Sequence, residues 1–163
     1  TIAPLAAAGL LPPGFDGVVE TEIRGFLWVA SVEYAANDFL LASEYSRWNL
    51  ELLTSLPNVF PDTRTVNERF YVMTSYRVTS WFTPGVYYSL LFPDVDDRSG
   101  RDAYQHDLAL TFRYDLTPNW LLKHEGHYMH GTADLVSALN EDKDLDTLAS
   151  NWGVLLIKTT AYF

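Results

Sequence analysis

Residues 106–130 read HDLALTFRYDLTPNWLLKHEGHYMH, and their pattern predicts two β-strands joined by a tight turn. In the first half, every second side chain is apolar: Leu108, Leu110, Phe112, Tyr114 and Leu116. A helix would need apolar spacings of three and four, which are absent here. The tripeptide TPN at 117–119 supplies Pro and Asn, both of which favour turns. Pairing across this turn makes opposing residue numbers sum to about 236, so His106 faces His130 and Phe112 faces His124.

The same two-residue period recurs along most of the chain. It predicts seven strands, at 24–36, 39–52, 68–81, 86–92, 106–116, 120–130 and 152–163. The short connections are 36–38, 82–85 and 117–119, and the long ones are about 53–67, 93–105 and 131–151. Short and long connections alternate strictly, so all the long loops lie at one end of the predicted sheet. This asymmetry is typical of transmembrane β-barrels, which have short periplasmic turns and long outer loops.

Aromatic residues gather at both ends of these strands. Near the short turns lie Tyr34, Trp81, Phe82, Trp120, Tyr162 and Phe163. Near the long loops lie Trp48, Phe92, Tyr128 and Trp152. Two such bands are expected where rings meet the two interfaces of a membrane, and strands of about ten residues cross hydrocarbon when tilted. The pattern therefore favours an all-β, antiparallel, up-and-down transmembrane barrel over a soluble all-β domain with its apolar faces turned inward.

The final strand, WGVLLIKTTAYF, is amphipathic and ends in Phe. It resembles the terminal signal of Gram-negative outer-membrane barrel proteins. The segments YDLTPNWLLKHEGHYMHGTADL, SYRVTSWFTPGVYYS and FLLASEYSRW resemble a porin-like family, and the resemblance covers the chain from about residue 20. It implies a bacterial outer-membrane location, with outer-membrane lipid and lipopolysaccharide as surroundings. It also implies recognition of the last strand by the outer-membrane assembly machinery.

The seven predicted strands form a single β-barrel segment within 1–163, with 1–23 as a loop or partial strand. Bacterial single-chain barrels have an even number of strands. We therefore expect the chain to be the C-terminal part of a larger barrel, completed by earlier strands or by another protein. In the alternative, residues 2–11 supply an eighth strand and close a small barrel.

Charge and composition exclude several function classes. The net charge of −10 argues against a nucleic-acid partner, because phosphates require a basic surface. The chain has no cysteine, which removes disulfides, thiolate metal sites and cysteine nucleophiles. The chain contains no run of eighteen apolar residues, so no transmembrane helix is expected. No cofactor is expected.

If lipid meets the apolar faces, the opposite faces line a pore. The predicted lining is Glu33, Glu44, Arg69, Tyr71, Arg77, Asp107, Arg113, Asp115, Lys123, Glu125, His127 and Lys158. Acidic and basic members balance, so strong ion selectivity is not expected. The resemblance to porins implies passive or weakly selective diffusion of small solutes. Alternatively, Arg113 and Lys123 pair with carboxylates of the neighbouring strand and stiffen the wall. The strand at 39–52 can be oriented either way, since Glu44 and Arg47 lie on opposite faces.

Two other functions fit the same sequence. A structural barrel that sheathes or anchors a partner would have a similar lining. An outer-membrane lipid hydrolase would need a serine and a histidine on one face, and no serine lies in a nucleophile motif or near a histidine in sequence. We therefore expect no enzymatic activity.

Histidines and acidic loops are the remaining metal candidates. The spacing of His124, His127 and His130 does not bring three ligands to one face of a strand, since the middle residue points the opposite way. His106 and His130, paired at the outer rim, could bind a metal together, respond to pH or form an ordinary interfacial pair. The acidic stretches at 94–97 and 141–146 lack the ligand spacing of a calcium loop, so we expect solvated loops.

Overall fold

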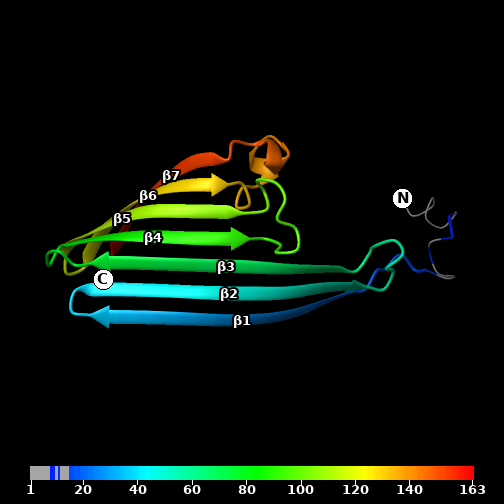
Figure 1. Ribbon diagram of the computed structural model, residues 1–163, viewed down its shortest axis with the longest axis horizontal. Coiled ribbons are helices and arrows are strands. Elements are labelled where there is room, and N and C mark those ends of the chain that lie inside the picture. Colours follow the sequence, from blue (N-terminus) through cyan, green and yellow to red (C-terminus); the bar gives the residue numbers. More distant parts are fainter. Residues whose placement is uncertain (1–7, 10, 12–14) are drawn as a thin grey trace.

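A computed structural model describes residues 8, 9, 11 and 15–163, and its strands form one antiparallel sheet in sequence order. Figure 1 shows the strands side by side, with the short connections at one end and the long ones at the other. The strands are β1 (Thr21–Ala36), β2 (Phe39–Thr54), β3 (Thr63–Tyr76), β4 (Phe82–Phe92), β5 (Gln105–Thr117), β6 (Trp120–Gly131) and β7 (Asn151–Ala161). The prediction of seven antiparallel up-and-down strands is confirmed. The proposed extra strand at 2–11 falls mainly outside the described residues.

The predicted boundary between the third and fourth strands is wrong. β3 ends at Tyr76 instead of 81, and the predicted turn at 82–85 is the beginning of β4. The chain turns before Phe82, where the backbones of Thr79 and Phe82 are hydrogen-bonded to each other. Pro84 and Gly85 are typical turn residues and suggested a turn here. The pairing of β4 with β3 begins only at Gly85, so Pro84 lies outside that pairing. β3 also begins earlier than predicted, because Thr63 already pairs with Leu52.

The register of the last hairpin is confirmed. His106 pairs with His130 and Phe112 with His124. The one irregularity lies between Asp115 and Thr117, next to the turn. A slip of one residue would move every apolar side chain of a strand to the other face, which is why the alternating pattern specifies this register.

The sheet has two chemically distinct faces. Cross-strand partners share a face, so the row Glu44, Tyr71, Ser89 and Asp107 identifies one of them, which we call the polar face. The other, the apolar face, carries large exposed side chains in its middle rows, among them Val32 (64%), Leu110 (55%), Leu155 (73%) and Ile157 (66%). Few apolar residues are buried in the described part of the chain: Leu56, Val66, Leu91, Ala103 and Ala109. The sheet is thus a single layer, and the middle rows of its apolar face have no cover among the described residues.

The two edge strands run in the same direction. Neighbouring strands alternate in direction, so β1 and β7, six steps apart, are parallel to each other. The sheet is open, and joining these edges directly would give a parallel pair. Antiparallel closure therefore requires an odd number of additional strands.

The loop-end connections contain two short 3₁₀-helices, Ser137–Leu139 and Leu145–Thr147. Among the described residues, no helix has the length and apolar character needed to cross a membrane.

Candidate functional site

The polar face carries eleven of the twelve predicted lining residues. Their positions follow from the strand register, which also settles β2: Glu44 lies on the polar face and Arg47 on the apolar face. Arg77 is the exception, since it follows β3 and donates its backbone N–H to Asp38 at the turn end. The sequence-derived set is therefore brought together on one surface.

The charges on the polar face are separated along the strands. Arg113, Lys123 and Lys158 occupy one cross-strand row near the turn end. Glu44 and Asp107 lie in a row nearer the loop end. The overall balance expected from the sequence thus hides a basic row at one end and an acidic region at the other.

Two of the basic side chains are neutralised along their own strands. Arg113 Nη2 lies 2.7 Å from Asp115 Oδ1, and Lys123 Nζ lies 2.7 Å from Glu125 Oε1. The expected pairing across neighbouring strands is wrong. Because Arg113, Lys123 and Lys158 are cross-strand neighbours of like charge, each paired cation turns to the carboxylate two residues along its own strand.

A buried acid–histidine pair lies toward the loop end of the polar face. His127 Nδ1 is 2.9 Å from Asp107 Oδ1 and 3.0 Å from Oδ2. The two side chains are only 15% and 13% exposed. His127 Nε2 is buried without a hydrogen-bond partner among the described residues, so no serine is positioned as a nucleophile there. The geometry is that of a structural pair on the wall of a cavity.

The loop between β6 and β7 brings a further carboxylate to this region. Asp134 joins Glu44, Arg69, Tyr71 and Asp107 around a cavity of about 360 Å³. The Asp134 residue is exposed, but partial loss of solvent around its carboxyl raises its pKa; Arg69 lowers this pKa and Asp107 raises it further. Sequence reasoning placed Asp134 in the departing loop and missed this role, because nothing local indicates that the loop turns onto the sheet.

The position of this loop is fixed by the neighbouring loop. Arg101 receives Thr132 N–H on its carbonyl at 2.8 Å and donates its guanidinium to Leu148 O at 2.8 Å. Its own backbone N–H donates to Asp146 Oδ1 at 2.6 Å. These contacts join the 93–104 and 132–150 connections into one unit at the loop end.

A second cavity of about 410 Å³ lies at the turn end of the polar face. Arg77, Arg113 and Lys123 line it, together with Asp38 and Met73. The two cavities therefore lie on one face and differ in charge, acidic toward the loops and basic toward the turns.

The expected interface aromatics divide between the faces. Tyr34, Phe82, Trp120 and Tyr128 lie on the apolar face, and Trp81 packs on Tyr114 of that face with ring centroids 6.2 Å apart. Trp48 and Trp152 lie on the polar face, as the strand register shows, which corrects their expected place in an apolar-face band. Tyr162 and Phe163 follow β7 at the turn end. The sequence reasoning missed Trp28 and Tyr45 on the apolar face, whose ring centroids lie 5.0 Å apart with the rings tilted.

The paired histidines at the loop end of the apolar face are held by hydrogen bonds. The rings of His106 and His130 are 5.9 Å apart. His130 uses both nitrogens, Nδ1 with Asn151 Oδ1 at 2.8 Å and Nε2 with Tyr104 Oη at 3.2 Å. His106 Nδ1 contacts Tyr88 Oη at 2.8 Å. In the described part of the chain, no group of three or more His, Cys, Asp or Glu residues is placed to hold a metal.

Comparison with family models, curated proteins and solved structures gave no match. The functional argument therefore rests on the two faces of the sheet and the groups that they carry.

Proposed function

We propose that this chain forms part of the wall of a bacterial outer-membrane β-barrel, with its polar face lining a channel for passive diffusion of small solutes. The observation that carries the proposal is the two-faced sheet, with charged residues on one face and exposed apolar residues on the other. In a membrane, lipid covers the apolar face and the backbone groups are satisfied by strand pairing.

The dimensions of the strands support this placement. They contain 11–16 residues, which exceeds the nine to eleven or so that a tilted strand needs to cross hydrocarbon. The middle rows of the apolar face hold side chains such as Leu110 and Leu155, with Trp81, Phe82 and Trp120 toward the turn end. A water-soluble protein would have to cover this face with a second layer.

Strand direction constrains what completes the barrel. Because β1 and β7 run the same way, a second copy in the same membrane orientation would also meet this sheet as a parallel pair at that junction. The partner must instead supply an odd number of strands, either from earlier parts of a longer chain or from another protein. Lipopolysaccharide and the assembly machinery are the further partners that this location implies.

The groups on the polar face suit a weakly selective channel. The loop that carries Asp134 lies against the polar face at its acidic end. Arg77 and Lys158 lie toward its basic end. A solute moving along this face would pass both signs of charge, so neither cations nor anions would be strongly excluded.

Planar-bilayer recording tests the proposal. The protein is purified from outer membranes with whatever strands complete its barrel, and single-channel steps are recorded in potassium chloride. Stable steps are expected. An intact barrel that never conducts would overturn the channel and leave a sheath or anchor for a partner protein. Release from membranes by carbonate without detergent would overturn the membrane placement itself.

A further inference from the structure

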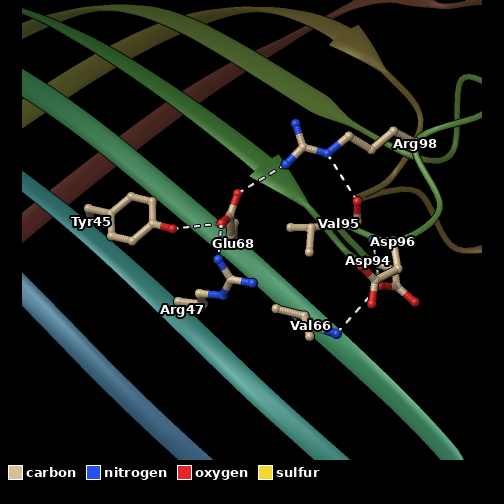
Figure 2. A network of polar contacts seen from close by, with 8 residues as sticks. All are labelled: Tyr45, Arg47, Val66, Glu68, Asp94, Val95, Asp96 and Arg98. Carbon is tan, nitrogen blue, oxygen red and sulfur yellow. Dashed lines mark hydrogen bonds and ion pairs between the residues drawn. The ribbon is translucent and has the colours of Figure 1, made fainter.

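A charged network lies at the loop end of the apolar face, where the strands should leave the membrane. Glu68 on β3 accepts hydrogen bonds from Tyr45 Oη at 2.7 Å and Arg47 Nη1 at 3.1 Å, both on Oε1. Arg98, from the 93–104 connection, donates Nη2 to Glu68 Oε2 at 3.2 Å. Figure 2 shows the carboxylate between the two guanidinium groups, with the tyrosine on a third side.

The network presents its cations outward and keeps its anion inside. The Glu68 side chain is 17% exposed, whereas those of Arg47 and Arg98 are 37% and 51% exposed. Arg98 is further positioned by its Nε–H, which donates to Val95 O at 3.2 Å, and by the Phe92 ring 4.2 Å from its Cζ. The two guanidinium groups are therefore pre-ordered on the surface rather than free to move.

The guanidinium groups of Arg47 and Arg98 have more N–H donors than these contacts use. A guanidinium carries five N–H groups. Arg47 uses one of them, and Arg98 uses two, in the hydrogen bonds formed among the described residues. Two guanidinium groups around one carboxylate leave the network with a charge of about +1, and such paired forks suit phosphate oxygens.

Acidic neighbours limit where an anion can approach. Asp94 and Asp96 lie beside the network on the 93–104 connection (Figure 2). One Asp94 oxygen is engaged with the backbone N–H groups of Val66 and Asp96, at 3.4 and 3.1 Å. An anion that approached from the membrane side would meet the guanidinium groups without passing these two carboxylates.

The rows beneath the network change from polar to apolar. One row further along the same face are Tyr45 and Phe70, and the next row holds Val32, Val72 and Leu108. Each row is about 7 Å further along the strand. A ligand with a phosphate at its head and hydrocarbon behind it would match this order of groups.

We propose that Arg47 and Arg98, held apart by Glu68, bind the phosphate group of an outer-leaflet lipid whose acyl chains lie along the apolar face below them. This inference rests on the proposed membrane placement, but not on the channel being open. It assigns lipid contact to guanidinium groups at the membrane edge rather than to the acidic loops.

Lipid titration of the purified, delipidated protein in neutral detergent tests the site, with native mass spectrometry as the readout. The probes are dihexanoyl phosphatidic acid and dihexanoyl phosphatidylcholine, which share their chains. Wild-type protein should prefer phosphatidic acid. The double variant Arg47→Gln/Arg98→Gln should bind it at least about tenfold more weakly, as expected when charged hydrogen bonds are lost.

The matched control is Arg24→Gln/Arg64→Gln. Arg24 and Arg64 lie on the same face, and replacing them removes the same charge. Arg64 is, however, about 13 Å beyond Glu68 along β3. The control should stay within about twofold of wild type, because charges beyond a Debye length of about 10 Å are screened. Equal loss in both double variants would show a diffuse charge effect and overturn the site.

Further outcomes test the lipid site separately from the proposed channel activity. Equal binding of the two lipids, or full displacement by inorganic phosphate at matched concentration, would overturn the lipid assignment. Phosphatidic-acid preference in a protein that never conducts would support the site while the channel fails. Normal conductance with unaltered binding by Arg47→Gln/Arg98→Gln would overturn only the lipid site. Circular dichroism confirms that each variant keeps its β-sheet.

Discussion

His127 on β6 directs Nδ1 to both carboxylate oxygens of Asp107 on β5, at 2.9 and 3.0 Å. An ionised carboxylate only accepts hydrogen bonds, so the proton of this contact is on Nδ1, which leaves Nε2 as the other ring nitrogen. That nitrogen is buried and has no hydrogen-bond partner among the described residues. The pair thus joins two strands on the polar face and leaves one polar atom unsatisfied.

Replacing His127 with Ala should destabilise the protein. Asp107, of which 9% is exposed, would lose its histidine donor, and an unsatisfied buried charge costs about 1–3 kcal/mol or more. Urea unfolding measures the change. Asp107→Asn should cost less, because an amide oxygen can still accept the Nδ1 proton. Equal stability of His127→Ala and wild type would show that the pair contributes nothing.

Replacing Gly131 with Ala should loosen the loop end. Gly131 has φ of +106°, and an added Cβ would overlap the carbonyl oxygen of Tyr104. Backbone strain of this kind costs about 1–3 kcal/mol, to which the overlap adds. Limited proteolysis should cut the 93–104 connection faster in the variant, because that connection carries Tyr104.

Gly126 is the matched control for Gly131, since it lies on the same strand with no atom within 4 Å of an added Cβ. Gly126→Ala should leave proteolysis unchanged and stabilise slightly, by less than about 1 kcal/mol. If both variants are cut at the wild-type rate, the close contact at Gly131 is not important for loop docking.

The local sequence pattern predicted the last hairpin correctly and the loops poorly. The pairing of His106 with His130 followed from a short turn and one apolar face, which together allow a single register. Pro84 misled because its local preference for a turn was outweighed by strand pairing with β5, in which Phe82 and Pro84 already take part. Asp134 could not be placed from sequence, because the contacts of Arg101 with Leu148 and Asp146 that hold its loop join distant segments. The ion pairs along β5 and β6 could not be predicted either, because they depend on which charges the strand register makes neighbours.

The contribution of Asp134 to stability should fall as the pH rises. Its pKa is raised above the ordinary 3.8, so the folded protein holds this proton over a range in which the unfolded chain has released it. The contribution of Asp134 to stability is therefore greatest below about 3.8 and decreases until the pH passes the raised value. Urea unfolding of wild type and of Asp134→Asn across this pH range should show the decrease as a change in the difference between their free energies of unfolding. Asp134→Asn, which stays neutral, should lack this component and be at least as stable as wild type at pH 7.

The control for this pH effect is Glu141→Gln. Glu141 lies in the same loop in an exposed ion pair with Lys143, 2.7 Å apart, which should contribute little. It should show the same pH profile as wild type. A profile in Asp134→Asn identical to that of wild type would assign the pH dependence to other groups.

Removing Arg69 should increase the preference of the proposed channel for cations. Arg69 is the one basic side chain lining the loop-end cavity of the described chain, which also holds Glu44, Asp107 and Asp134. Without it, the local potential becomes more negative and cations concentrate there. The reversal potential under a tenfold potassium chloride gradient measures the shift for Arg69→Gln.

Glu44→Gln is the opposing test, since it removes one negative charge from the same cavity. It should shift the reversal potential toward anions, and Arg69→Gln should shift it toward cations. Both shifts should shrink near 1 M salt, where the Debye length falls to about 3 Å. Shifts of the same sign would mean that the variants alter the shape of the constriction rather than its charge. No shift in either, with conductance intact, would place the selective region elsewhere on the polar face, with the basic row of Arg113, Lys123 and Lys158 as the next region to vary.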